Sequence, residues 1–404
     1  MFRKIPMDEL KKGMKLCALE KDDTGRPSFF MNSLLVRSDA DIETFRGRGY
    51  GIAYVIPDDC AAGPAGEPDP QDAAHPVLDA GAALPEAVEF EEEIYRAASL
   101  KDEAIAHVMG FLTDIRAGRS IDAEAFGLIV VRMIDSIFRN PEALTCLAWL
   151  RDNDDCTFRH SLNSCILSIA LGSELGFNRE KLIELGMAAV LHDIGKLLVP
   201  GALLKKTGRY TESELAQMQR HSELGADLLH KTDGIKRSSI ITARQHHERM
   251  DGKGYPEGLS GTRIHEFGRI VSVAEGYEAM TSERAYRKSF TPHEALQVMS
   301  FGNNSVYDAR FLQGFIRCVG IYPIGSVVEL STGEIAVVKS NDREDPLKPA
   351  VLVVLNRNGQ SLAPPVELAL SECKGLCIKG SASPGKYGID TNRFILGEHG
   401  RPLA

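Results

Sequence analysis

The sequence predicts a multidomain, mainly α-helical protein with a small α/β domain at its N-terminus and a small β unit near its C-terminus. Through the middle of the 404-residue chain, apolar residues recur every three or four positions, which is the period of an amphipathic helix. At both ends, short apolar runs bounded by glycine, asparagine or aspartate are typical of strands and hairpins. A stretch rich in alanine, proline and glycine separates the N-terminal part from the rest.

Residues 1–57 are expected to form the small N-terminal α/β domain. The segments 29–36 ("FFMNSLLV") and 51–57 ("GIAYVIP") are predicted strands. Residues 38–49 are a predicted helix, with Ser38 or Asp39 as its N-cap and glycine at its end. Residues 58–88 form a linker whose composition cannot build a core, and His75 within it is expected to be solvated.

Residues 89–323 are predicted to form one helical domain of at least seven helices, whose core lies at about 150–320. The expected helices lie within residues 91–118, 122–140, 159–177, 181–200, 211–230, 238–250 and 267–283. Thr211 and Glu214 have the spacing of a capping box, which predicts that a helix begins there. Gly176 is suited to end the third of these helices.

Residues 324–380 are predicted to form a β-rich tail. Residues 326–340 contain a strand, a Thr-Gly turn and a second strand, and residues 350–360 contain a strand followed by an Asn-Gly turn. Residues 381–404 support no prediction.

Composition limits the classes of function. Hydrophobic residues make up 43% of the chain and charged residues 25%, both ordinary for a globular protein. The net charge of −9 argues against DNA or RNA as a partner, although a few local cations can still hold a small phosphorylated ligand. Neither a bilayer-spanning apolar run nor a secretion signal is evident, so a cytoplasmic location is expected. The eight cysteines have no disulfide-like spacing and are expected to be reduced thiols.

Potential metal ligands occur on five successive predicted helices. They are imidazoles and carboxylates: His160, His192, Asp193, His221, His246, His247 and Glu275. A single helical histidine, or a lone His-Asp pair, is more often structural than functional. However, the apolar segment 188–200 ("AAVLHDIGKLLVP") contains a histidine, an aspartate and a lysine, and burying unpaired charge costs several kcal/mol. A bound metal ion would offset that cost.

The ligand types indicate which metals and which chemistry to expect. Imidazole and carboxylate ligands without thiolate suit Fe, Mn, Ni, Co or Zn better than Mg or Ca. The set is larger than one ion needs, and Asp193 could bridge two ions. A pair of ions about 3.5–4 Å apart is a common device for hydrolysing phosphodiesters.

Three motifs in this region resemble those of the HD-GYP family, a branch of the HD phosphohydrolase superfamily. They are "HDIGK" (192–196), "HHERMDGKGYP" (246–256) and "TSERAYRKS" (281–289), and the resemblance covers about residues 150–320. The flanking segments 5–14 ("IPMDELKKGM") and 320–338 resemble companion regions of one HD-GYP subgroup. That subgroup has a small N-terminal domain of unassigned function and a β-rich C-terminal tail.

The resemblance implies a helical-bundle HD-type metal phosphohydrolase core that hydrolyses cyclic di-GMP to pGpG, GMP or both. It implies two divalent transition-metal ions, with Fe, Mn or Ni favoured over Mg or Ca. By position, His160, His192, Asp193 and Glu275 would hold the first ion, and Asp193 would bridge to a second ion held by His221, His246 and His247. Lys196 and Asp193 match catalytic positions, and Lys196, Tyr255, Arg284 and Arg287 match substrate-binding positions. Other signalling proteins, such as diguanylate cyclases, and a homodimer are also compatible with the family.

Adjacent histidines on a helix differ by about 100° in direction, so His246 and His247 can both reach one ion only if the end of the helix points between them. The following "DGKGYP" would then turn the chain across the mouth of the site, with Asp251 as an anchor of the loop or helix end rather than a ligand.

The sequence departs from the family pattern at three positions. Glu275 replaces the usual aspartate, Cys156 replaces the glutamate that holds a third ion in some members, and Ala285 replaces a proline. The extra methylene of Glu275 moves its carboxylate by about 1 Å, a displacement that can cost on the order of a hundredfold in rate. Because Cys156 stands where the third ion's glutamate would be, a third metal site is not expected. Two alternatives stay open, a receptor or interaction module that binds the dinucleotide without turnover, and a phosphohydrolase for another cyclic dinucleotide.

Overall fold

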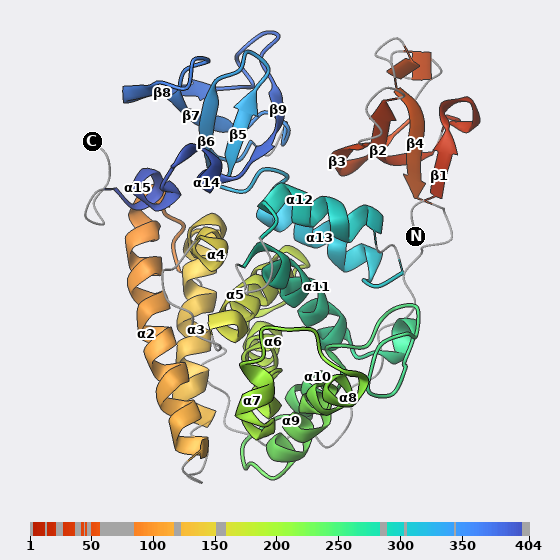
Figure 1. Ribbon diagram of the computed structural model, residues 1–404, viewed down its shortest axis with the longest axis vertical. Coiled ribbons are helices and arrows are strands. Elements are labelled where there is room, and N and C mark those ends of the chain that lie inside the picture. The colour runs from red at the N-terminus through yellow and green to blue at the C-terminus, as the bar shows by residue number, and fades with distance from the viewer. Residues whose placement is uncertain are drawn as a thin grey trace. The chain divides into compact units, whose positions relative to one another are not determined.

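The computed structural model describes residues 3–12, 14–21, 27–36, 42–43, 45–46, 50–56, 85–116, 123–150, 159–282, 289–302, 305–342 and 345–397. The chain divides into two compact units, Met1–Asp69 and Pro70–Ala404, and each is described by itself (Figure 1).

The first unit is built on an antiparallel four-stranded sheet of order β1-β4-β2-β3. Its strands are β1 (Arg3–Pro6), β2 (Lys15–Lys21), β3 (Pro27–Leu35) and β4 (Tyr50–Ile56), and a 3-10 turn, η1 (Met7–Glu9), follows β1. The strands predicted at 29–36 and 51–57 are confirmed as β3 and β4, whereas β1 and β2 were not predicted. The predicted helix at 38–49 lies largely outside the described residues, although 42–43 and 45–46 are helical.

Most of the predicted linker, including His75, lies outside the described residues. Residues 85–89 form neither helix nor strand, and the first helix of the second unit begins at Phe90.

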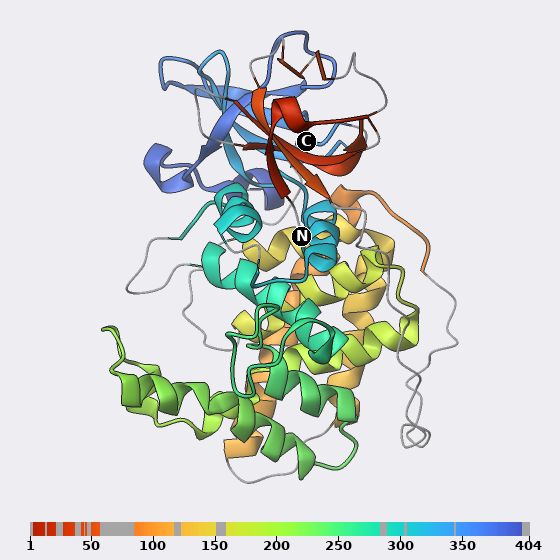
Figure 2. The same ribbon diagram turned by 90° about the vertical axis from the view of Figure 1, so that its right-hand side faces the viewer.

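The second unit begins with a bundle of helices, which confirms the mainly α-helical class. The longer ones are α2 (Phe90–Arg116), α3 (Ala123–Arg139), α4 (Pro141–Trp149), α5 (Arg159–Glu174), α6 (Arg179–Leu191), α9 (His221–His230), α10 (Arg237–Gln245), α11 (Glu266–Thr281) and α13 (Ala309–Val319). Shorter ones are α7 (Gly201–Leu204), α8 (Glu212–Gln219) and α12 (Pro292–Gln297), with the 3-10 turns η3 (Ile194–Leu198) and η4 (Gly261–Arg263) and the π-helical turn η5 (Val298–Gly302). In both views α2 and α3 run side by side along the bundle (Figure 1, Figure 2).

Helix α5 is the centre of this bundle. Every residue from Ser161 to Gly172 is buried, and the helix packs against α4, α6, α11 and α13. A helix that is covered on all sides needs no polar face, which accounts for its long run of small and apolar residues. Its first turn, which carries His160, is therefore held in a fixed position within the core.

Three predicted helices end earlier than expected, and each of these ends lies beside a histidine of the candidate ligand set. The predicted helix at 181–200 ends at Leu191, and His192 and Asp193 form a turn before η3. The predicted helix at 211–230 is two helices, α8 and α9, which meet at Arg220, and its capping box at Thr211 is confirmed. The predicted helix at 238–250 ends at Gln245. Figure 2 shows the segment around α7 and α8 projecting from the bundle, and α8 has no buried residue.

The C-terminal part is an antiparallel five-stranded sheet of order β8-β7-β6-β5-β9. Its strands are β5 (Val327–Leu330), β6 (Ile335–Ser340), β7 (Ala350–Leu355), β8 (Ser361–Ala369) and β9 (Ile378–Ala382). The strands predicted within 326–340 and 350–360 are confirmed. Two short helices, α14 (Pro384–Tyr387) and α15 (Thr391–Leu396), lie where the sequence supported no prediction. Among the helices that the structure describes, none is long and apolar enough to cross a bilayer.

Candidate metal centre

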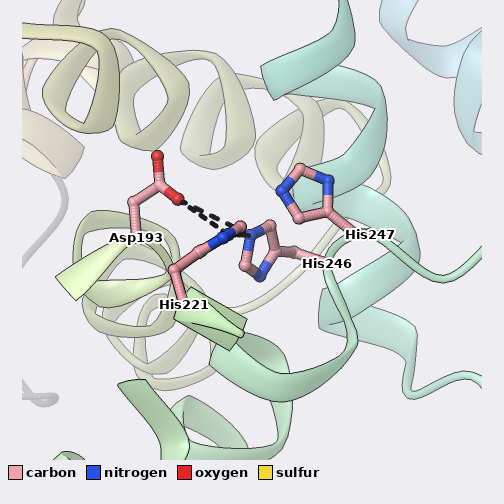
Figure 3. A group of neighbouring side chains, drawn as sticks. All are labelled: Asp193, His221, His246 and His247. Atoms are coloured by element: carbon pink, nitrogen blue, oxygen red, sulfur yellow. Dashed lines mark hydrogen bonds and ion pairs between the residues drawn. The ribbon is translucent and has the colours of Figure 1, made fainter. Parts of the chain in front are cut away.

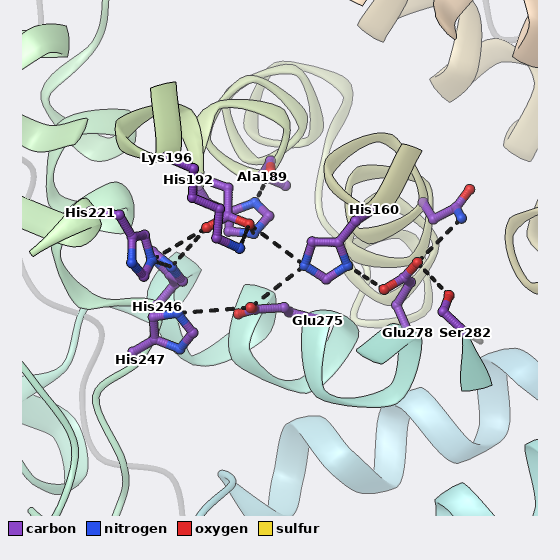
Figure 4. A network of polar contacts seen from close by, with 12 residues as sticks. His160, Ala189, His192, Lys196, His221, His246, His247, Glu275, Glu278 and Ser282 are labelled. Carbon is purple, nitrogen blue, oxygen red and sulfur yellow. Dashed lines mark hydrogen bonds and ion pairs between the residues drawn. The ribbon is translucent and has the colours of Figure 1, made fainter. Parts of the chain in front are cut away.

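The fold brings all seven predicted ligands into two adjoining groups that share Asp193 (Figure 4). The first group is His160, His192, Asp193 and Glu275, and the second is Asp193, His221, His246 and His247. Within each group, one nitrogen or oxygen of every residue lies within 4.8 Å of those of the others. These residues come from α5, α9 and α11 and from the turns after α6 and α10.

The first group faces one oxygen of the shared aspartate. Oδ2 of Asp193 lies 3.4 Å from Nε2 of His192 and 3.7 Å from Nε2 of His160. Nε2 of His160 also lies 3.6 Å from Oε1 of Glu275. The glutamate that replaces the family's aspartate therefore still places its carboxylate within this group.

The second group faces the other oxygen of Asp193 (Figure 3). Oδ1 lies 3.3 Å from Nε2 of His221 and 3.7 Å from Nε2 of His246. The two Nε2 atoms of His221 and His246 are 3.2 Å apart. His247 completes the group, and its Nε2 lies 3.9 Å from Oε1 of Glu275. The arrangement of Asp193, with one oxygen toward each group, is that of a bridging carboxylate.

Helix ends orient three of the imidazoles. His192 and His246 follow the last residues of α6 and α10, and their Nδ1–H groups donate to the carbonyls of Ala189 (2.6 Å) and Ala243 (2.9 Å). His221 likewise donates from Nδ1 to the carbonyl of Met218 (2.7 Å), in the last turn of α8. Carbonyls in the last turn of a helix lack intrahelical partners. Because each ring places its proton on Nδ1, its Nε2 keeps a lone pair that points into the site.

The unsatisfied atoms fit a metal ion. Nε2 of His160, Nε2 of His192 and Oδ1 of Asp193 are buried without a hydrogen-bond partner among the described residues. Two lone-pair nitrogens as close as those of His221 and His246 repel each other unless a cation lies between them. Donors about 2.1 Å from a common ion would be roughly 3.0–3.5 Å apart, which matches the shorter of the observed separations, 3.2–3.4 Å. Nitrogen and oxygen donors without thiolate suit a borderline divalent cation.

The electrostatics of the site also favour a cation. Burial is the largest effect on Asp193 and disfavours its charge, but the ammonium of Lys196 and the surrounding imidazoles together outweigh it and hold the pKa of this carboxyl well below its usual value. Burial lowers the pKa of His221 to about 4, so its imidazole is neutral at physiological pH. Burial is the largest effect on His160 and opposes its charge, but the carboxylates of Glu278 and Glu275 together prevail and raise the pKa of His160 to about 10. The field at His160 thus stabilises positive charge.

The loop after α10 crosses the site at a fixed position. Glu248 is buried, and its carboxylate accepts hydrogen bonds from the amides of Glu257 (2.7 Å) and Leu259 (2.9 Å). A Cβ on Gly254 would lie 2.5 Å from main-chain atoms of residues 247–249, so only glycine fits. This places the ring of Tyr255 in a stack on His247, with centroids 4.6 Å apart.

The structure describes two of the other residues singled out in the sequence, Lys196 and Asp251. Lys196 contacts Oδ2 of Asp193 and its side chain is 22% exposed, so its ammonium lies at the open side of the site. Asp251 belongs to neither group of candidate ligands and accepts hydrogen bonds from Arg249 and from the amide of Lys253, as expected of a loop anchor. The remaining predicted residues lie outside the described part of the chain: Cys156, Arg284, Ala285 and Arg287.

Sequence reasoning missed two buried carboxylates, Glu248 and Glu278. Glu278 contacts Nδ1 of His160 from the far side of the ring (Figure 4). Its position one helical turn after Glu275, on an otherwise apolar helix, was a signal that could have identified it.

A helical bundle with clustered histidines around a shared aspartate defines an HD-type metal-binding domain, and comparisons with known proteins agree. The HD domain family matches residues 150–311, a domain of unknown function (DUF3391) matches residues 2–126, and a KOW domain associated with HD domain matches residues 327–388.

Relatives from several bacteria match this chain. The chain is 32% identical over 360 residues to "Cyclic di-GMP phosphodiesterase PA4108" of Pseudomonas aeruginosa, which covers 87% of this chain and 85% of that protein. It is 32% identical over 201 residues to "Cyclic di-GMP phosphodiesterase PdeB" of Borreliella burgdorferi, and this match covers 50% of this chain and 52% of that protein. It is 39% identical over 145 residues to "3'3'-cGAMP-specific phosphodiesterase 1" of Vibrio cholerae, and this match covers 35% of this chain and 33% of that protein. A solved HDG"Y"P protein from Bdellovibrio bacteriovorus aligns with a TM-score of 0.47 at 17% identity, over 78% of this chain and 98% of that chain. The chain belongs to the HD-GYP family.

Proposed function

We propose that this protein is a metal-dependent phosphodiesterase that hydrolyses cyclic di-GMP to pGpG, GMP or both. The observation that carries the proposal is the pair of ligand groups that share Asp193, because two adjoining cation sites suit the cleavage of a phosphodiester. The relatives named as cyclic di-GMP phosphodiesterases support the choice of substrate.

The two groups would hold one divalent transition-metal ion each, with Fe, Mn or Ni favoured. When bound, such ions supply an activated water and neutralise charge on the attacking and leaving oxygens. Asp193, His192, His221 and His246 are almost fully buried, and among the described residues of the centre the side chains of Lys196 and His247 are the most exposed, at 22% and 25%, which favours the approach of water from their side. The phosphodiester would enter from that side.

The chain's own residues would bind and orient the substrate at this opening. The ammonium of Lys196 lies beside Asp193, where it can neutralise a phosphate oxygen or donate a proton to the leaving oxygen. Tyr255 stacks on His247 and would contact the substrate beside it. Arg284 and Arg287 are proposed to clamp the phosphates, a role that suits the planar guanidinium group. Diguanylate cyclases as partners, and a homodimer, stay predictions.

One observation favours a second candidate substrate. A relative that is 39% identical over 145 residues is named a 3'3'-cGAMP-specific phosphodiesterase. A hybrid dinucleotide presents the same phosphodiester ring with one different base, so rates on both dinucleotides must be compared.

The test is hydrolysis of cyclic di-GMP and of 3'3'-cGAMP by the full chain loaded separately with Mn²⁺ or Fe²⁺. We expect turnover of cyclic di-GMP by the wild type, with Glu275→Ala reducing it by at least a hundredfold and Glu275→Asp retaining it. Glu212→Ala, an exposed change on α8, is the control. A metal-loaded wild type that binds cyclic di-GMP but leaves it intact would establish the receptor alternative. Faster turnover of 3'3'-cGAMP would change the assigned substrate.

A further inference from the structure

His160 is oriented differently from the other buried imidazoles of the centre. His192, His221 and His246 each donate from Nδ1 to a carbonyl three residues earlier, in the last turn of a helix. His160 is the second residue of α5, so the residue three positions earlier precedes the helix. Its Nδ1 instead contacts Oε2 of Glu278, which comes from α11.

Glu278 is itself held firmly. It is buried, and its Oε1 accepts a hydrogen bond from Oγ of Ser282 (2.7 Å), the residue that caps the C-terminus of α11. Nδ2 of Asn163, one turn after His160 on α5, lies 3.5 Å from the same oxygen. Donors from both helices therefore fix the carboxylate against the imidazole (Figure 4).

Helix α11 thus places a carboxylate beside each ring nitrogen of His160. Glu278 meets Nδ1, while Glu275, one turn earlier, places Oε1 3.6 Å from Nε2. A carboxylate can only accept here, so Nδ1 carries a ring proton, and when an ion occupies the first group the lone pair of Nε2 faces that ion. A carboxylate partner also makes the opposite nitrogen more basic than a carbonyl partner does.

We propose that Glu278 is a positioning residue that fixes the tautomer and direction of His160 and thereby sets the metal affinity of the first group. The second group does not depend on it, because carbonyls of α8 and α10 orient His221 and His246 and the ring of Tyr255 stacks on His247. The inference rests on the metal centre of the proposed function and not on catalytic turnover. Loss of a partner of this kind typically weakens metal binding by 10–100-fold.

The experiment compares the full chain with Glu278→Gln and Glu278→Asp. Mn²⁺ is titrated into each protein while free Mn²⁺ is followed by electron paramagnetic resonance, which gives stepwise dissociation constants without any substrate. We expect Glu278→Gln to weaken one of two binding steps by 10–100-fold and to change the other by less than about threefold. Glu278→Asp should lie between Glu278→Gln and the wild type. Glu266→Gln, the same change on the same helix, is the control, because Glu266 pairs with Lys181 away from the site.

A spectroscopic readout separates positioning from general loss of structure. In protein labelled with ¹⁵N-histidine, the ring nitrogens of His160 report which of them carries the proton, and His160→Gln identifies its signals. With diamagnetic Zn²⁺ bound, the wild type should show a proton on Nδ1 and none on Nε2, and Glu278→Gln should show a mixture of tautomers or a displaced signal, with the thermal transition of the protein retained.

Several results would overturn the inference. They are unchanged Mn²⁺ affinities in Glu278→Gln, an equal loss in both steps, or ring signals of His160 that do not respond. A wild type that binds no Mn²⁺ would refute both the inference and the proposed metal centre. A wild type that binds two ions with the expected Glu278 dependence but hydrolyses no cyclic dinucleotide would refute the proposed activity alone.

Discussion

Replacing Gly195 with alanine should damage the second ligand group, because the main chain of η3 crosses α9 with no space for a side chain. A Cβ on Gly195 would lie 1.9 Å from the carbonyl oxygen of His221 and 2.5 Å from the amide nitrogen of Gly225. Ordinary contact begins at 3.4 Å. The two segments would therefore have to separate by about 1.5 Å, since neither main-chain atom can rotate away.

That separation acts directly on the metal centre. Asp193 precedes η3 and His221 begins α9, and their facing atoms are 3.3 Å apart across this same crossing. A displacement of about 1 Å at a reacting centre can cost on the order of a hundredfold in rate. Overpacking of this kind also costs about 1–3 kcal/mol in the free energy of unfolding. We expect both effects in Gly195→Ala.

The assay measures the hydrolysis rate, the number of metal ions bound per chain and the urea unfolding midpoint of Gly195→Ala. Gly201→Ala is the matched control, because a Cβ at Gly201 would have no neighbour within 4 Å. We expect the control to behave as the wild type, and Gly195→Ala to lose at least one ion and at least a hundredfold in rate. If Gly195→Ala retains both ions and the rate of the wild type, the close crossing does not set the geometry of the site.

Further predictions test the ions, the loop anchor and the aromatic stack. Removing the ions with a chelator should lower the thermal transition, because an ion at about 100 times its dissociation constant adds roughly 2.7 kcal/mol of stability; a transition that does not respond would argue against a resident metal. Hydrogen bonds from Arg249 lower the pKa of Asp251 from 3.8 to about 2. Because its folded-state pKa is depressed, the Asp251 carboxylate stabilises the fold above about pH 4 and loses this effect as the pH falls toward 2. Asp251→Asn should thus lower the free energy of unfolding by about 1 kcal/mol at pH 7, after allowance for solvent screening, and by less at pH 3. Urea unfolding at both pH values measures this difference. An equal loss at both pH values would show that the charge of the carboxylate is not the cause. Tyr255→Leu should weaken metal binding at His247 by up to about tenfold because the ring stack is lost, whereas Tyr255→Phe should not, and equal Mn²⁺ affinities in the two variants would exclude a role for the stack.

The fold was predictable where a single period runs through a long segment. The predicted helices at 91–118, 122–140 and 267–283 are close to α2, α3 and α11 because a buried stripe fixes their pattern. The nine-residue helix α4 escaped notice, although Asn140 caps it and Pro141 begins it, because nearly all of its residues are apolar and show no period. Strand β1 has only four residues, and β2 ("KLCALEK") has lysines at both ends and no strict alternation of polar and apolar residues, so neither shows the period of a strand clearly.

The candidate ligands of the site could be predicted from the sequence motifs, but the residues that orient these ligands could not. The sequence indicated which imidazoles and carboxylates would meet, since charges in apolar segments need partners. It could not indicate that Glu278 orients His160, because 118 residues separate them and only the packing of α11 on α5 brings them together. The proposed phosphate clamp at Arg284 and Arg287 lies outside the described residues and stays a prediction.

The helix ends that sequence patterns missed explain why this centre favours a cation. Glycine is a common signal for the end of a helix, but α6, α8 and α10 end beside histidines whose Nδ1–H groups donate to carbonyls of the last turn. One hydrogen bond therefore both satisfies a helix terminus and aims an imidazole lone pair into the site. Each helix C-terminus also carries partial negative charge, worth about 0.3–1 kcal/mol toward a nearby cation. Because α6 and α10 end at His192 and His246, whose rings lie beside Asp193, the backbone adds to the negative potential that the carboxylates give the site, and substitution of a single carboxylate should weaken metal binding without abolishing it.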